Sequence, residues 1–214
     1  MTPRLLALDT CLVSDALDAL GLPGATTGIR PLHGTARTVA GAAVTVRIGP
    51  RGSAAPAHHL ATPAVAASGP GQVLVIGNQG RTDVSAWGGI LSFAAARRGI
   101  EGVVVDGAAR DIGEAEELGF PVYGRAAVPV TARGRIVQEA WDVPVDFAGV
   151  TVDPGDLVLA DVNGVVFVPR DRADEVIAVA ERLAARERAM IEAVRAGESV
   201  VDVMHDSRFE EATR

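Results

Sequence analysis

The pattern of hydrophobic and polar residues divides the first third of the chain into helix, strand and helix. Residues 12–20 place apolar side chains at helical spacing with polar ones between them, and Gly21 follows, so we expect a short N-terminal helix. Residues 38–48 are β-branched and partly alternating, which predicts a strand. Residues 54–67 favour a helix of modest quality, because two prolines interrupt them.

A repeated unit of strand, glycine loop and helix occupies the middle of the chain. Strands that alternate with helices predict parallel strands joined by right-handed crossovers. Ligands of such sheets collect at the carboxyl ends of the strands, where both glycine loops lie. The units are strand 72–76, loop 77–81 and helix 84–98, then strand 102–106, loop 107–110 and helix 112–118, before a short strand at 121–123.

The last part of the chain changes to short strands and one long helix. Gly, Pro and Asp separate the strands, which is typical of antiparallel sheet. The predicted strands are 135–139, 150–152, 157–160 and 165–168. Residues 171–196 predict a long helix that packs on its own core or on a neighbouring subunit, and the polar residues 202–214 are expected to be mobile. We therefore expect one α/β domain over residues 1–214.

Composition narrows the class of protein. The 214 residues are 48% hydrophobic but only 4% aromatic, which suits a sheet of small aliphatic residues under helices. The net charge of −7 argues against a nucleic-acid surface, because phosphate binding needs basic side chains. Cys11 is the single cysteine, and acids among the first twenty residues interrupt any signal peptide or membrane span. We expect a cytoplasmic protein with no nucleic-acid or membrane partner.

Lysine is absent, and all twenty basic residues are arginine. This excludes a lysine Schiff base, and with it class I aldolase chemistry and the attachment of pyridoxal phosphate. It also excludes the lysine of P-loop nucleotide-binding enzymes. Carbonyl chemistry in this protein would therefore need a metal ion or an arginine as its electron sink.

The stretch 106–111, Asp-Gly-Ala-Ala-Arg-Asp, is the main candidate for chemistry, because it joins a predicted strand to a predicted helix. Asp111 could ligate a hard cation such as Mg²⁺, which needs only one or two protein carboxylates. Arg110 could hold a substrate carboxylate or stabilise an enolate oxygen. The alternative is structural: Asp111 would cap the helix and Arg110 would form a surface ion pair.

Other polar clusters carry weaker signals. Glycines at 77–83 could hold an anion at a helix start, or serve only as turn residues. His33, His58 and His59 show no metal-ligand spacing with an acid, and we interpret them as surface or loop residues. Residues 153–156, Asp-Pro-Gly-Asp, lie between two predicted strands and should form a turn.

Seven short motifs run through nearly the whole chain. They are Val13-Ser-Asp-Ala-Leu17, Gly34-x-Ala-x-Thr38-Val39, Ala86-Trp-Gly88, Arg98-Gly-Ile-Glu-Gly-Val-Val-Val-Asp-Gly107 with Arg110-Asp111, Gly119-Phe-Pro-Val122, Gly149-Val-x-Val-x-Pro-Gly-Asp156 and Ala160-Asp-x-x-Gly-Val165. In this order they resemble the RraA-like family. That family includes the 4-hydroxy-4-methyl-2-oxoglutarate/4-carboxy-4-hydroxy-2-oxoadipate aldolases and relatives with oxaloacetate decarboxylase activity.

The resemblance implies a fold, an assembly, a cofactor and a site. The fold is a swivelling β/β/α-type domain with a long C-terminal helix, the assembly is a homotrimer or hexamer, and the cofactor is Mg²⁺ or Mn²⁺ between subunits. Asp111 is then the metal ligand, and Arg110 contacts the keto or enolate oxygen. Glu187 of the partner subunit supports water at the metal. The pyruvyl carboxylate is held by the backbone of Gly88, Gly89, Ile90 and Leu91.

Gly89 is the main departure from the family pattern. The aldolases carry an acid at the corresponding position, which would orient water at the metal or assist proton transfer. In this chain Asp83 or Glu114 would have to replace it.

Together with the resemblance to the RraA-like family, these residues predict a metal-dependent lyase, a class II aldolase or decarboxylase. It would cleave a carbon–carbon bond of a small 2-oxo acid, either a 4-hydroxy-2-oxo acid or oxaloacetate, through a pyruvate-type enolate. Two alternatives stay open: a protein that binds and inhibits a ribonuclease E-type enzyme, and a pathway-specific lyase or isomerase on the same fold. The intact pair of Arg110 and Asp111 favours the enzyme.

Overall fold

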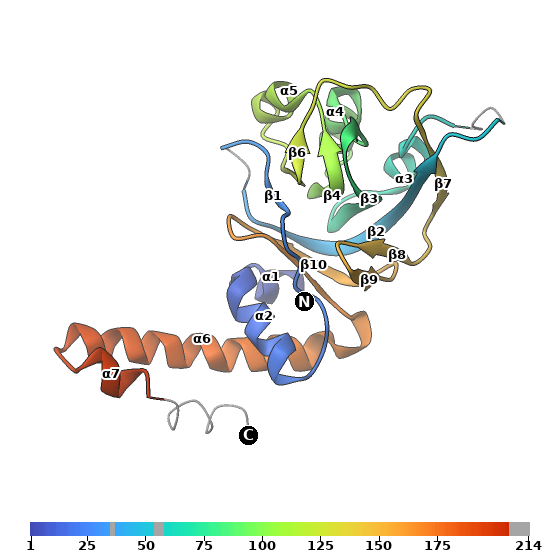
Figure 1. Ribbon diagram of the computed structural model, residues 1–214. Helices are drawn as coiled ribbons and strands as arrows, with labels where there is room; N and C mark the ends of the chain where they lie inside the picture. Colours follow the sequence, from blue (N-terminus) through green and yellow to red (C-terminus); the bar gives the residue numbers. More distant parts are fainter. Residues whose placement is uncertain (35–36, 54–57, 206–214) are drawn as a thin grey trace.

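A curved sheet forms the centre of the protein. The computed structural model describes residues 1–34, 37–53 and 58–205 (Figure 1). Within this part of the chain the strands follow the order β1-β5-β4-β3-β2-β10-β11, with β6 beside β4 and β7 beside β2, while β8 and β9 form a separate ladder. Their bounds are β1 (Arg30–Pro31), β2 (Val39–Pro50), β3 (Gln72–Ser85), β4 (Gly102–Ala109), β5 (Val122–Gly124), β6 (Ala126–Ala127), β7 (Ile136–Trp141), β8 (Val145–Phe147), β9 (Val150–Val152), β10 (Leu157–Ala160) and β11 (Val165–Val168).

The strand directions confirm the predicted change along the chain. β2, β3, β4 and β5 pair in parallel, as their strand–helix pattern predicts. β10 pairs antiparallel with both β2 and β11. The turn that the sequence predicts at 153–156 is present, because the Asp153 N–H donates to the Asp156 carboxylate at 2.9 Å.

Helices cover both sides of this sheet, as Figure 1 shows. One group packs on the parallel strands, and the other packs beneath β10 and β11. A third apolar cluster fills the inside of the curved sheet, against β8 and β9. The helices are α1 (Thr2–Leu5), α2 (Thr10–Ala19), α3 (Thr62–Ala67), α4 (Gly89–Arg97), α5 (Ile112–Glu117), α6 (Ala173–Arg195) and α7 (Val200–Val203). The result is a mixed α/β domain with a nearly closed, barrel-like sheet.

The long C-terminal helix is confirmed as α6. It begins two residues later than predicted, because a turn of 3₁₀ helix at Arg170–Arg172 precedes it. Its buried residues lie between Ala173 and Ala184, where it packs on α2, and its second half projects beyond the body of the protein (Figure 1). None of the helices described here is both long and apolar enough to cross a bilayer.

Some predicted boundaries were wrong. Residues 77–81 belong to β3 and not to a loop, and the following helix begins at Gly89 and not at residue 84. The strand continues through the glycines, but its register with β4 shifts there, and Gln79 and Gly80 take left-handed φ values of 57° and 69°. The helix predicted at 54–67 forms only at Thr62–Ala67, because residues 58–61 are not helical. Residues 54–57 of that prediction lie outside the described part, as do residues 206–214 of the predicted mobile tail.

His33 differs from its predicted surface position. It lies outside regular structure, as expected of a loop residue, but it is buried. One ring nitrogen lies 3.0 Å from the carbonyl oxygen of Phe120. The histidine therefore packs against the segment that precedes β5.

Asp106 joins three segments at one end of the sheet. Its carboxylate is buried and accepts the N–H groups of Gly80 and Ala148, each at 3.1 Å. It also pairs with the Nε of Arg125 at 2.6 Å. Asp106 thereby fixes the irregular part of β3, the turn after β8 and the segment after β5, and it lies outside the group of residues that line the candidate site.

Replacing Asp106 with Ala should lower the free energy of unfolding by about 3 kcal/mol. The change removes one partner of a buried ion pair and leaves two backbone N–H groups without their acceptor. Urea denaturation would measure the loss. Asp83→Ala is the matched control, since Asp83 forms an exposed pair with Arg81 and should leave the midpoint nearly unchanged. Equal midpoints for both variants would contradict this role.

Candidate functional site

Arg110, Asp111 and residues 88–91, which the sequence nominates, lie around one cavity. It has a volume of about 420 Å³ and lies where β4 ends and α4 begins. Arg110 and Asp111 contribute side chains that are 38% and 33% exposed. The other lining residues are His59, Leu60, Ser85, Ala86, Trp87, Gly88, Gly89, Ile90, Leu91, Thr131, Ala132 and Arg133.

Trp87 fixes the segment that carries the start of α4. Its indole N–H donates to Ser92 Oγ at 2.8 Å, and its ring stacks on Phe120 with centroids 6.3 Å apart. The Trp87 carbonyl accepts the N–H of Arg110 at 3.0 Å. A buried, bonded aromatic residue therefore sets the distance between the end of β4 and the first turn of α4.

Asp111 faces α4 instead of capping its own helix. It stands at the N-cap position of α5 with a left-handed φ of 56°, and its side chain makes no capping hydrogen bond there. Its Oδ2 accepts the N–H of Gly89 at 3.0 Å and lies 3.2 Å from Nε of Arg110. The structural alternative, a helix cap, is therefore wrong for Asp111. No other described residue donates a hydrogen bond to its second oxygen, Oδ1.

The first turn of α4 offers backbone donors to the cavity. Gly88 stands at the N-cap without a side chain, and the N–H of Leu91 is already bonded to the Gly88 carbonyl. Asp111 takes the N–H of Gly89. Among the described residues, the N–H groups of Gly88 and Ile90 have no acceptor, so they remain available to an anion at this positive helix end.

Glycine at 88 and 89 allows acidic and basic side chains to approach this turn. A Cβ on Gly88 would stand 3.0 Å from Asp111 Oδ2 and 3.3 Å from Arg110 Nε. A Cβ on Gly89 would stand 1.7 Å from Oε2 of Glu114. The Glu114 carboxylate therefore occupies the space that a side chain at 89 would fill.

The two acids that could replace the one missing at Gly89 have different surroundings. Asp83 is bound by Arg81, whose guanidinium donates two hydrogen bonds to it and lowers its pKa. It is not among the residues that line the cavity. Glu114 is not among the lining residues either, but its carboxylate lies against Gly89, where the family's acid would stand.

Comparison with known proteins places this geometry in a family. Residues 10–167 match the family model of RraA-like proteins, described as Aldolase/RraA. The chain belongs to the RraA-like family. Its relatives include a "Putative 4-hydroxy-4-methyl-2-oxoglutarate aldolase" of Halalkalibacterium halodurans, 34% identical over 206 residues that cover 92% of this chain and 91% of the relative.

Two other relatives match this chain over less than two thirds of their own length. Protein DlpA of Legionella pneumophila is 31% identical over 208 residues, which cover 97% of this chain but 34% of DlpA. An uncharacterized protein of Methanocaldococcus jannaschii, MJ0644, is 33% identical over 127 residues, 59% of this chain and 61% of its own length. The chain therefore spans about a third and three fifths of these two relatives.

Solved structures agree with the RraA-like fold. An uncharacterized protein from Pseudomonas syringae has a TM-score of 0.84 at 33% identity, covering 95% of this chain and 96% of that one. RraAS2 from Streptomyces coelicolor, described as an unusual member of the RNase ES inhibitor RraA protein family, has a TM-score of 0.79 at 29% identity, covering 87% and 93%. The RraA-like fold thus carries both aldolase and inhibitor names.

The donor set suits a cation that needs few protein ligands. The described residues contain no group of three or more His, Cys, Asp or Glu side chains arranged for a metal. Asp111 Oδ1 and the nearby Glu114 match Mg²⁺ or Mn²⁺, which bind one or two carboxylates and complete their shell with water or substrate. Glu187 lies in a groove between α6 and α2, apart from this cavity within one chain, so its role across a subunit interface stays a prediction.

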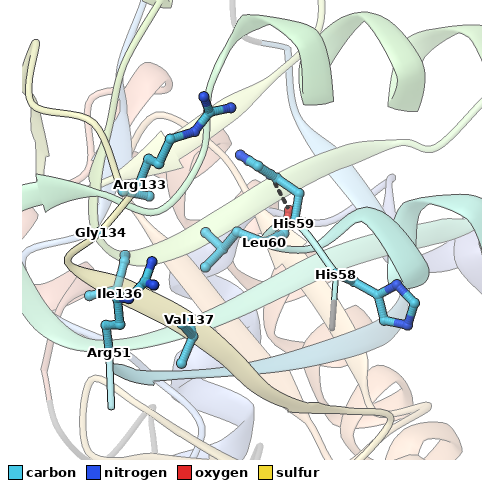
Figure 2. Close-up of a pocket in the computed structure, with 9 residues that line it drawn as sticks. Arg51, His58, His59, Leu60, Arg133, Gly134, Ile136 and Val137 are labelled. Carbon is cyan, nitrogen blue, oxygen red and sulfur yellow. Dashed lines mark hydrogen bonds between the residues drawn. The ribbon is translucent and has the colours of Figure 1, made fainter. Parts of the chain in front are cut away.

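Sequence reasoning missed a group of basic side chains beside the site. Arg133 and His59 line the main cavity, and both also line a second cavity with Arg51 and His58 (Figure 2). The arginines stand in irregular segments that lack a motif, and the histidines were interpreted as surface or loop residues for want of an acidic partner. Only the fold brings these segments together.

A double-mutant cycle tests the position of Glu114. Gly89→Ala should cost about 1 kcal/mol of stability, because the new methyl group must displace the Glu114 carboxylate. In a Glu114→Ala background the same change should cost less, because only the Asp111 Cβ, 3.1 Å away, then remains close to the new methyl group. Urea denaturation of the four proteins gives the coupling. The same effect of Gly89→Ala in both backgrounds would place Glu114 elsewhere.

Proposed function

We propose that this RraA-like protein is a lyase that cleaves a carbon–carbon bond of a 2-oxo acid through a pyruvate-type enolate. One observation carries the proposal: Arg110, the Asp111 carboxylate and the free N–H groups of α4 meet at a single cavity. The name of the Halalkalibacterium relative supports an aldolase. The groups present can bind a carboxylate, a keto oxygen and a hard cation side by side.

The substrate carboxylate binds at the first turn of α4. The N–H groups of Gly88 and Ile90 donate to it, and the positive end of the helix favours its charge. Arg110, held in place by the hydrogen bond between its backbone N–H and Trp87, directs its guanidinium at the adjacent keto oxygen. Negative charge that develops on that oxygen meets a fixed cation, which lowers the energy of the enolate.

Asp111, with Glu114 beside it, would hold Mg²⁺ or Mn²⁺. When bound there, the ion supplies Lewis-acid polarisation of the substrate's oxygens. Asp111 suits this role because the Gly89 N–H bonds only its Oδ2, so that Oδ1 stays available to the ion. The Glu114 carboxylate lies against Gly89 and outside the lining of the cavity, so its proposed role is to accept a hydrogen bond from water near the ion.

The bond between C3 and C4 of the substrate breaks. In a 4-hydroxy-2-oxo acid the C4 hydroxyl gives up its proton and becomes a carbonyl, and the electron pair of the broken bond passes into the enolate of pyruvate. In oxaloacetate the same bond breaks with loss of CO₂. Protonation of C3 then gives pyruvate in either case, and Arg110 faces the same enolate oxygen throughout.

Assembly and location belong to the same proposal. A homotrimer or hexamer would bring Glu187 of the partner subunit toward Asp111, and the reaction would take place in the cytoplasm. Size-exclusion chromatography with light scattering measures the assembly directly. A purely monomeric enzyme would remove Glu187 from the site.

Replacing Arg110 with Gln or Asp111 with Asn should lower pyruvate formation by at least about a thousandfold, because each variant loses a charge aimed at the reacting end. Coupled lactate dehydrogenase detects the pyruvate from oxaloacetate and from 4-hydroxy-2-oxo acids. Asp83→Asn is the control, because Asp83 does not line the cavity. Full turnover in either site variant would overturn the proposal.

Treatment with EDTA should abolish the same activity, and Mg²⁺ or Mn²⁺ should restore it. The readout independent of turnover is Mn²⁺ binding, followed by electron paramagnetic resonance in the wild-type protein and in Asp111→Asn. The variant should bind Mn²⁺ at least about tenfold more weakly, because it loses the anionic ligand. Undiminished affinity in the variant would place the metal elsewhere.

The inhibitor names among the relatives define the competing outcome. A protein that turns over none of these 2-oxo acids but lowers the activity of a purified ribonuclease E-type enzyme would be an RraA-type inhibitor. The convergence of Arg110 and Asp111 on a cavity favours the lyase, since binding to a protein surface does not require it.

A further inference from the structure

His59 lines the same cavity as Arg110 and Asp111. The reaction proposed for this cavity moves one proton, because the C4 hydroxyl of a 4-hydroxy-2-oxo acid loses a proton and C3 of the enolate gains one. The acid that the aldolases carry for such a transfer is replaced in this chain by Gly89. The cavity therefore needs its proton carrier from another element.

Among the described residues that line this cavity, His59 is the one suited to carry a proton near neutral pH. Arginine keeps its proton, so Arg110 and Arg133 cannot exchange one. The serine and threonine of the lining are too weakly acidic, and Asp111 is assigned to the cation. Histidine is the side chain whose ordinary pKa lies between pH 5 and 8, where one ring nitrogen can both accept and donate.

The carbonyl of Leu60 orients the ring of His59. Nδ1 of the ring lies 3.4 Å from this carbonyl oxygen, and Figure 2 marks the contact. A carbonyl oxygen can only accept a hydrogen bond, so Nδ1 carries the hydrogen and Nε2 has the lone pair of the neutral ring. No described residue bonds Nε2, which leaves this atom available to take up and release a proton.

The backbone holds His59 in place although the residue is exposed. The His59 carbonyl accepts the N–H of Thr62 at 3.2 Å and the Thr62 hydroxyl at 2.7 Å. The N–H of Ala61 donates to Oε1 of Gln138 at 2.9 Å, which ties the turn to β7. Ala61 takes a left-handed φ of 60°, a strained conformation for a residue with a Cβ. This strained and hydrogen-bonded turn keeps His59 in the lining of the cavity.

We propose that His59 is the proton carrier of the lyase reaction. Neutral Nε2 takes the proton of the C4 hydroxyl while the bond between C3 and C4 breaks and C4 becomes a carbonyl carbon. The imidazolium then gives this proton to C3 of the enolate, and the ring returns to its neutral form. The cleavage therefore gains and loses no net proton. This role rests on the proposed function and supplies the transfer that Gly89 leaves without an acid.

The same carrier should exchange the methyl protons of pyruvate with solvent. Neutral Nε2 removes a methyl proton, the electron pair of the C–H bond passes into the enolate, and the imidazolium exchanges its proton for a deuteron of D₂O. The deuteron then returns to C3. This reaction breaks no carbon–carbon bond, so it separates the proton transfer from the cleavage.

Proton NMR of pyruvate in D₂O with Mg²⁺ measures the exchange. His59→Gln should lower its rate at least about a hundredfold, and it should lower kcat for 4-hydroxy-2-oxo acids with little change in KM, because Arg110 and α4 still bind the substrate. His58→Gln is the matched control, since His58 lines only the adjoining cavity, and it should keep both rates. Mn²⁺ should bind equally to the wild type and both variants.

The pH profile gives a readout that a structural role would not change. Both reactions begin with a neutral imidazole, so their rates should fall as the pH is lowered through the range in which histidine gains a proton, about pH 5 to 8. His59→Gln should lack this fall, and His58→Gln should keep it. The other charged groups that line the two cavities in the described part of the chain are Arg51, His58, Arg110, Asp111 and Arg133.

Imidazole in the buffer should restore part of the activity of His59→Ala, because the exposed position leaves a space that solvent can reach. Mg²⁺ prefers oxygen ligands, so this rescue would not act through the cation. Wild-type exchange and turnover in His59→Gln would overturn the role of His59 and keep the lyase. Weaker Mn²⁺ binding in His59→Gln, or no rescue by imidazole, would also overturn it. A wild-type protein that neither forms pyruvate nor exchanges its methyl protons would remove the lyase and the proton carrier together.

Discussion

The hydrogen bond from the Gly89 N–H to the Asp111 carboxylate is the contact on which the candidate site depends. It joins the first turn of α4 to Asp111, which follows Arg110 just after the end of β4. Three local conditions make it possible: a left-handed backbone at Asp111, and glycine at both 88 and 89, where a Cβ would meet the acidic and basic side chains. The left-handed φ of Asp111 and the two glycines make this turn less stable than an ordinary one. A turn with only a structural role would not need them.

Two buried residues hold in place the elements that form this contact. Asp106 holds the irregular end of β3 against β4, and Trp87 holds the start of α4 against Phe120. Both are buried, so the two strand ends that present Arg110 and the α4 turn cannot shift independently. Arg110 and Asp111 can therefore be partly exposed to solvent and still be held in place, as the proposed stabilisation of an enolate requires.

Periodicity predicted the parallel strands, α6 and the position of Arg110 and Asp111, because each depends on residues close in the sequence. It could not predict that residues 77–85 continue β3, since glycines in a strand and in a loop look alike until the neighbouring strand is known. The direction of the Asp111 side chain was also beyond reach, because it depends on a left-handed φ. Arg51 and Arg133 line one cavity because β2 pairs with β7, and the residues of these two strands are far apart in the chain.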